Sequence, residues 1–366
     1  MSGVIAISVN AAQKTGGKNP KQYRQTRNGK IDFYKFIFSL VVMYYHFSFA
    51  GNYPEEIFKR GYIAVEFFFL VTGFLYAGSL SKYNNVNNTV IKDSLDFSFK
   101  KYKSVFSYHI FACVITFIYT AFLYQWDFNL FMSYLVNDLP NILLIQMFGF
   151  DKMGFVRHEW YISAMLIVMF VLTPIIMKNY KLFVRCIAPI VSVFYFGYLY
   201  NHYDSINVVT EWTGFAYAGL IRAFADICLG CVCYEIYKGG VLQKVGKFGL
   251  ILIECISVAV TLIYCNNLIK TNLDYVIALV TAVCVTVAFS SETSINILNN
   301  KVVYYLGRLS FAIYINHNFI RFMMSKVEWN IGYFPQLLIY TFFVLTVSML
   351  CMLFVDTVSG DKRRKR

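Results

Sequence analysis

Two ionisable residues in the first apolar run of the chain have spacing suited to a reactive site. Lys35 and His46 are eleven residues apart, and eleven helical steps leave only about 20° of rotation, so both side chains share one helix face about 16 Å apart. Asp32 precedes Lys35 by three residues and could pair with it. An imidazole can act as a base and an ammonium group can bind an anion. A lysine that reaches towards water and an interfacial histidine would give the same pattern.

Glu66 lies in the next apolar run, which a short polar link separates from the first. If the two runs form a hairpin, Glu66 enters the membrane from the side on which His46 ends, and the two residues reach a similar depth. A carboxylate opposite a histidine orients the imidazole and makes it a better general base. The alternative is a glutamic acid that is protonated in lipid or bonded to neighbouring backbone. We therefore expect His46 and Glu66 to be catalytic residues.

A second pair of ionisable residues lies in the middle of a later apolar run. Arg222 is followed one helical turn later by Asp226. Charged groups deep in a membrane are costly, so each of them needs a partner or a function. A structural ion pair between the two explains both residues about as well as a substrate-binding arginine does.

Polar residues also interrupt two other apolar runs. Arg308, Tyr314 and His317 belong to one run, and the segment Arg157–Trp160 opens another. A single histidine among aromatic residues is more often a packing residue than a catalyst. Tryptophan next to charged residues is typical of an anchor at the membrane boundary. These residues are weaker candidates for a site than His46.

The nine cysteines of the chain all lie in or beside apolar runs, as buried reduced thiols do. Cys228 and Cys231 have the spacing of a metal-binding or redox pair. No second pair and no nearby histidine completes such a site. We therefore expect no metal.

The composition indicates that these residues lie in a polytopic helical membrane protein. Of 366 residues, 58% are hydrophobic and only 14% are charged, whereas an average soluble chain carries about 25% charged residues. This composition excludes a disulfide-rich secreted scaffold, a disordered chain and a soluble nucleic-acid binder. The sequence predicts an all-α bundle of about ten transmembrane helices. They fall at about residues 33–50, 61–80, 104–124, 159–177, 182–200, 212–237, 249–265, 273–290, 302–324 and 334–355.

Basic residues predict the orientation of this bundle. Lysines and arginines concentrate in the segments that face the cytoplasm when both termini lie there, and this distribution accounts for most of the net charge of +13. We expect residues 1–30 and 357–366 to be basic cytoplasmic tails, the first of them disordered, with the membrane domain at residues 31–356. An apolar stretch at residues 139–150 is too short to cross and is expected to lie at the interface or re-enter.

Five segments follow one another in a recognisable order: Ile31–Lys35 with Val41–His46, Gly61–Phe74, His158–Ala164, Arg222–Gly230 and Leu306–His317. In this order they resemble the acyltransferase 3 family of integral membrane acyltransferases, most of which are bacterial. The similarity runs from about Ile31 to Phe354.

The resemblance implies transfer of an acyl group, usually acetyl, from cytoplasmic acyl-CoA to a hydroxyl of a sugar or glycan. By the same resemblance, His46 is the catalytic base and Glu66 supports it, while Lys35 and Arg222 are associated with the donor or the site. Lys35 stands where the family usually has arginine, which keeps the charge but loses the bidentate fork. Glu66 stands where aspartate is also common, which preserves the carboxylate.

These residues would divide the work of acyl transfer between them. The phosphates of acyl-CoA would be drawn to the basic inner loops and to Lys35 or Arg308, while His46 removes the proton of the attacking hydroxyl. Arg222 or Tyr314 would stabilise the oxyanion. The residues expected to bind substrate are Lys35, Arg222, Arg308, Tyr314, His317 and Trp160.

The expected partners are acyl-CoA, most simply acetyl-CoA, a glycan or lipid-linked sugar, and membrane lipid, with no cofactor and no nucleic acid. The protein is expected to be a multi-pass protein of a cell membrane, such as the inner or plasma membrane of a bacterium. Two other functions also fit a basic, polytopic chain: a glycan or lipid transporter, and a structural component of a polysaccharide export complex. The absence of a visible inverted repeat disfavours the transporter.

Overall fold

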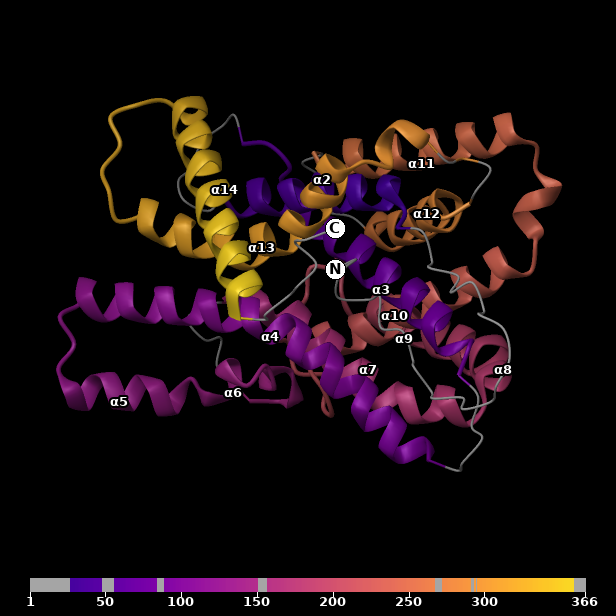
Figure 1. Ribbon diagram of the computed structural model, residues 1–366, viewed down its shortest axis with the longest axis horizontal. Helices are drawn as coiled ribbons and strands as arrows, with labels where there is room; N and C mark the ends of the chain where they lie inside the picture. The colour runs from indigo at the N-terminus through magenta and orange to yellow at the C-terminus, as the bar shows by residue number, and fades with distance from the viewer. Residues whose placement is uncertain are drawn as a thin grey trace, which may run out of the picture.

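The computed structural model describes residues 27–47, 56–83, 89–150, 157–266, 272–290, 293 and 295–358 (Figure 1). Within these ranges the chain is helical, and the only strand-like pairing is one isolated bridge between Trp212 and Tyr217. The expected all-α fold is therefore confirmed. Apart from residues 27–30 and 357–358, the two expected tails lie outside the described residues.

Each of the ten predicted apolar runs coincides with a helix or with a series of consecutive helices in the described part of the chain. These elements are α2 (Gly29–Phe47), α3 (Ala64–Leu80), α4 (Val90–Leu123), α7 (Trp160–Lys178), α8 (Tyr180–Leu182) continued by η5 (Phe183–Ile187) and α9 (Ala188–His202), α10 (Ala218–Lys238), α11 (Lys247–Cys265), α12 (Leu273–Ala288), α13 (Lys301–Met324) and α14 (Tyr333–Val358).

Six of these described elements are long and apolar enough to cross a membrane. They are α3 with the turn η2 before it (Gly61–Ile63), α4, α7, the α8–η5–α9 series, α11 and α14. The chain is thus a multi-pass membrane protein, whereas ten spans with both ends inside stay a prediction. Of the four remaining helices, α12 is shorter, with 16 residues. The other three, α2, α10 and α13, carry charged side chains.

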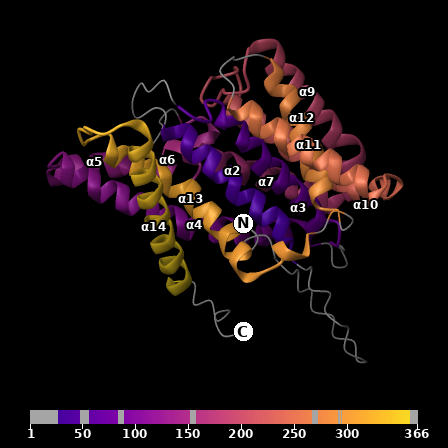
Figure 2. The same ribbon diagram turned by 90° about the horizontal axis from the view of Figure 1, so that it is seen from above.

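The charged helices α2, α10 and α13 are among the most buried of the described chain. In Figure 2, α2, α3 and α7 lie between α4, α13 and α14 on one side and α9, α11 and α12 on the other. Helix α2 packs along α13, and α10 packs along α3. By contrast, α9, α11 and α14 leave many apolar side chains exposed. Polar side chains therefore face one another inside the bundle, and the apolar surface faces outward.

Small residues let the inner helices touch backbone to backbone. A Cβ atom on Gly73 of α3 would lie 2.1 Å from the carbonyl oxygen of Ile227 on α10. A Cβ atom on Gly307 of α13 would lie 2.4 Å from the Cβ of Asp32 on α2. Close approach through small residues is typical of helix pairs in membranes. These crossings fix the depth at which side chains of the paired helices meet.

The predicted short apolar stretch at residues 139–150 does not form a spanning helix. It contains α6 (Leu139–Ile142) and the single turn η3 (Gln146–Phe148). Before it, α5 (Phe128–Asn137) has no buried residue and runs back beside the end of α4, so the pair projects from the body of the protein (Figure 1).

Candidate functional site

Three of the five histidines of the chain converge between helices that are far apart in sequence. His46 lies near the end of α2, His158 lies in the turn η4 (Arg157–Glu159) before α7, and His317 lies in α13. The ring centroid of His46 is 3.7 Å from that of His158 and 4.9 Å from that of His317. His317 is buried, whereas the other two rings are partly exposed. We call these three residues the histidine cluster.

The hydrogen bonds of the histidine cluster define which ring nitrogens carry protons. Nδ1 of His317 lies 2.6 Å from the carbonyl oxygen of Tyr314 and 3.2 Å from that of Ile313. Since a carbonyl only accepts, this nitrogen donates, and Nε2 of His317 holds the lone pair. Nδ1 of His46 lies 3.0 Å from the carbonyl oxygen of Val42 and 3.1 Å from that Nε2. Both partners of His46 Nδ1 are acceptors, so the lone pair of His46 is on Nε2.

Glu66 does not make the contact with His46 that the hairpin predicted. Among the described residues, no hydrogen bond joins these two side chains, and the Glu66 carboxylate instead accepts two hydrogen bonds from Arg222, from Nε at 2.6 Å and from Nη2. Nη2 of Arg222 also donates to the carbonyl oxygen of Tyr62 at 2.9 Å. The reason is the close crossing of α3 and α10, which brings the guanidinium group to the carboxylate.

Of the two alternatives for Arg222, the structure favours an ion pair, but its partner is Glu66 on another helix and not Asp226. Asp226 is fully buried one turn away and interacts electrostatically with both Glu66 and Arg222. Two carboxyl groups and one guanidinium group thus share one buried site between α3 and α10. The guanidinium group also lies over the ring of Trp160, 5.3 Å from its centroid. Both arginine nitrogens donate to the same oxygen, Oε1 of Glu66, and this buried ion pair ties two helices together.

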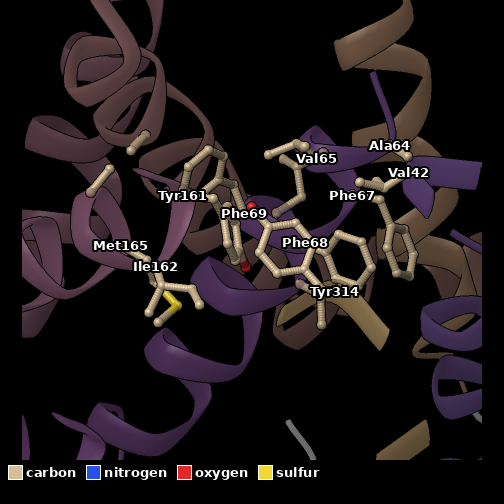
Figure 3. Packing of buried hydrophobic residues seen from close by; sticks show 14 of the residues in the cluster. Val42, Ala64, Val65, Phe67, Phe68, Phe69, Tyr161, Ile162, Met165 and Tyr314 are labelled. Carbon is tan, nitrogen blue, oxygen red and sulfur yellow. The ribbon is translucent and has the colours of Figure 1, made fainter. Parts of the chain in front are cut away.

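Aromatic side chains of α3, α7 and α13 pack together in this part of the bundle. Phe68 of α3 lies between Tyr161 of α7 and Tyr314 of α13, with centroid distances of 6.2 and 6.4 Å (Figure 3). The Tyr314 hydroxyl donates to the backbone carbonyl of His158. Tyr314 therefore fixes the position of His158 rather than pointing a free hydroxyl at a substrate. Trp160 is buried against Phe69.

Behind His158, a second polar group lies deep between α4 and α7. Nδ1 of His109 is 2.6 Å from Glu159 Oε2, and its Nε2 is 2.9 Å from the carbonyl oxygen of Ile142. The sulfur of Cys113 is 3.5 Å from both ring nitrogens, so it lies on the direction of neither lone pair. This arrangement is a buried acid–imidazole pair and not a thiol–imidazole nucleophile.

The opposite end of α2 carries a cluster of cations. Lys35 is buried with its Nζ 3.7 Å from Asp32 Oδ1, and Arg27 bonds the other oxygen of that carboxylate. Lys101 of α4 is buried close enough to Lys35 to interact electrostatically, and its Nζ makes no hydrogen bond within the described structure. Three cations therefore face one carboxylate here. Arg308 is apart from this group and bonds Asp356 at the end of α14.

Two residues near the histidine cluster were missed as site residues from the sequence. His158 was interpreted as part of an interfacial anchor, because its neighbours in the fold come from segments more than a hundred residues away. Arg321 was not among the residues expected to bind substrate, yet its charge acts on His46 and His317. Its spacing of four residues from His317, one turn along α13, was the available signal.

Comparison with known proteins gives one match. A family model described as an acyltransferase domain matches residues 28–353, which include α2 and nearly all of α14. No curated protein and no solved structure shows significant similarity to the chain.

Proposed function

The chain belongs to the acyltransferase 3 family, and from this membership we propose that it transfers an acyl group, most simply acetyl, from acyl-CoA to a hydroxyl of a glycan or lipid-linked sugar. The thioester C–S bond breaks and an ester C–O bond forms. The hydroxyl proton passes through the base to the departing thiolate, so that CoA leaves as a thiol. In this proposal the protein lies in a cell membrane, as in bacteria, and acyl-CoA binds from the cytoplasmic side.

The observation that carries the proposal is the protonation pattern of His46. Its Nδ1 faces two acceptors, the carbonyl of Val42 and Nε2 of His317, which assigns the proton of a neutral imidazole to Nδ1 and the basic lone pair to Nε2. A base that is held by two hydrogen bonds and is partly exposed has the properties that removal of a hydroxyl proton requires. In this proposal His46 Nε2 takes that proton and later returns it to the thiolate.

His317 is the group that orients this base. Its tautomer is fixed by backbone carbonyls of its own helix, and its Nε2 then accepts from His46. This is the role that the sequence assigned to Glu66. In the proposed mechanism His317 replaces Glu66 as the orienting partner, and Glu66 acts through Arg222 to hold α3 against α10.

The oxyanion needs a cationic or N–H donor close to His46. Arg222 and Tyr314, the two expected donors, are bonded to Glu66 and to the His158 carbonyl. Arg321 is partly buried, its Nε donates to Asn318 Oδ1 at 3.1 Å, and its charge acts on His46. We assign the stabilisation of the oxyanion to Arg321 because of this positive charge beside His46.

The donor would bind at the other end of α2. A surplus of buried positive charge around Lys35 and Lys101, with Asp32 as counter-charge, suits the phosphates of acyl-CoA. About 16 Å separates Lys35 from His46 along the helix, a length that the pantetheine arm would have to bridge. Arg308 pairs with Asp356 at the rim and would act only on the outer part of the nucleotide.

The experiment compares membranes that contain the wild-type protein with membranes that contain His46→Gln. Labelled acetyl-CoA is supplied, and both CoA release and glycan labelling are measured. We expect both to fall by about 100-fold or more, since a general base contributes that much. Retention of more than about a tenth of the activity would overturn the assignment of His46. A wild-type protein that releases no CoA would overturn acyl transfer itself.

The chain provides a matched control in His202. Its Nδ1 bonds the carbonyl oxygen of Tyr198 at 2.8 Å, four residues earlier, as His46 bonds Val42. It is exposed and lies outside the histidine cluster. His202→Gln removes the same kind of local contact and should leave CoA release unchanged.

A further inference from the structure

We propose that the histidine cluster binds a divalent transition-metal ion of the Zn²⁺ class. Acyl transfer from a thioester by general-base catalysis does not require such an ion. The binding proposal therefore rests on the geometry of His46, His158 and His317 alone.

The distances between the rings fit one shared ion. A nitrogen of each ring lies within 4.8 Å of a nitrogen of the other two, and His317 Nε2 is 3.1 Å from His46 Nδ1. Zn–N bonds of about 2.0–2.1 Å in a tetrahedral site separate ligand nitrogens by about 3.3–3.4 Å. Coordination would replace the hydrogen bond between His46 Nδ1 and His317 Nε2, and small side-chain rotations are enough to bring one nitrogen of each ring to a shared ion.

The rings are also held as metal-binding histidines are held. Such histidines donate their second N–H to a backbone carbonyl or carboxylate, which fixes the ring and its tautomer. His317 does so through Nδ1 to Tyr314, and Tyr314 in turn bonds the backbone of His158. The three ligands thus belong to one connected structure in which α13 positions two of them.

The donor type selects the class of ion. Imidazole suits Zn²⁺, Cu²⁺, Ni²⁺ and Fe²⁺, whereas Mg²⁺ and Ca²⁺ prefer oxygen ligands. His46 and His158 are half-buried residues, so this site lies nearer to the protein surface than a site with three buried ligands would.

A second group, His109, Cys113 and Glu159, also meets the distance criterion for a metal. Nδ1 of His109 pairs with the Glu159 carboxylate and its Nε2 bonds the carbonyl oxygen of Ile142, so an ion there would break a buried acid–imidazole pair, whereas in the histidine cluster it would replace a bond between two imidazoles. All three side chains are buried, so an ion would have to displace these bonds without access to water. The histidine cluster is therefore the favoured metal site, and the group of His109, Cys113 and Glu159 is the alternative that the experiment must distinguish from it.

A bound ion would prevent His46 from acting as a base. A neutral imidazole has one lone pair, and coordination uses it. This consequence, unlike the binding itself, rests on the proposed acyl transfer. Zn²⁺ should therefore inhibit CoA release, and a chelator should restore it.

The test uses the full-length protein, purified in detergent with an affinity tag free of histidine and stripped with a chelator. Zn²⁺ alone and Co²⁺ alone are titrated in the absence of acyl-CoA. We expect one ion per chain, and a Co²⁺ spectrum of nitrogen coordination without a thiolate charge-transfer band. His158→Gln and His317→Gln should each weaken binding at least tenfold, and the exposed His202→Gln should not.

Several outcomes would overturn the proposal. Wild-type protein that binds no ion would do so, as would a thiolate band that disappears in Cys113→Ser. If a histidine variant fails to fold, the Co²⁺ spectrum of the wild-type protein still decides between the two groups. Because binding is measured without substrate, a failure of the metal site is distinguishable from a failure of acyl transfer.

Discussion

Removal of the Arg222 side chain should destabilise the protein far more than removal of an exposed arginine. Arg222→Met keeps much of the volume but deletes two hydrogen bonds to Glu66 and one to the Tyr62 carbonyl. The Glu66 side chain is 0% exposed and would remain in place without its cation. The cost therefore includes both the lost bonds and the burial of an unpaired carboxylate.

The magnitude follows from this burial. Truncation of one partner of a buried pair typically costs about 3–5 kcal/mol, because the remaining charge has no compensation. Arg185 supplies the contrast: it pairs with Glu235 at 3.2 Å, but its side chain is 64% exposed. Exposed pairs contribute about 0.2–1 kcal/mol. Arg222→Met should thus lower stability several times more than Arg185→Met.

The assay is unfolding of the purified protein in mixed micelles by increasing denaturing detergent, followed by circular dichroism and gel filtration. The double variant Glu66→Leu/Arg222→Met removes both charges of the pair and should recover part of the loss, since apolar pairs replace buried ion pairs at little cost, while Asp226 stays buried without the guanidinium group. Equal effects of Arg222→Met and Arg185→Met would refute the buried pair. A double variant less stable than Arg222→Met would refute the unpaired carboxylate as the cause.

Three further predictions concern the donor site, the oxyanion and the helix crossing. Lys101→Met should raise KM for acetyl-CoA about tenfold with kcat little changed, whereas the exposed Lys103→Met should change neither, as steady-state kinetics of CoA release will show. Arg321→Gln should lower kcat about 10²-fold with KM for acetyl-CoA unchanged, and an unchanged kcat would contradict its role. Gly73→Ala should lower the free energy of unfolding by about 1–3 kcal/mol or more in the same assay, because the added Cβ atom collides with the backbone of α10. Gly197→Ala should be neutral or slightly stabilising, because its added Cβ atom has no neighbour within 4 Å.

Hydropathy alone predicted the helices well, because each apolar run is long enough to be distinguished from its polar links. It also placed α2 and α3 in succession with Lys35 and His46 at opposite ends of α2. The short stretch at residues 139–150 was correctly excluded as a span, since its helices α6 and η3 are only a few residues long.

The partners of the site residues could not be predicted in the same way. Helical spacing offered only Asp226 as a possible partner of Arg222, whereas the structure supplies Glu66, 156 residues away, through a glycine crossing. His317 reaches His46 across 271 residues. Periodicity within one helix gives no information on which helices pack together, so it cannot identify contacts of this kind.

The inner position of the charged helices has a consequence for how the chain enters the membrane during synthesis. Lys30 on α2 has its partners, Glu254 and Thr293, more than 220 residues later in the chain, and α2 packs on α13, which ends at Met324. Until those segments are translated, the charged side chains of α2 have no partners and are exposed to lipid or to the insertion machinery. An isolated charge in lipid is energetically unfavourable. Truncated chains that end before α11 should therefore be poorly retained in the membrane or rapidly degraded. The enzyme's polar interior makes its assembly a late and cooperative event.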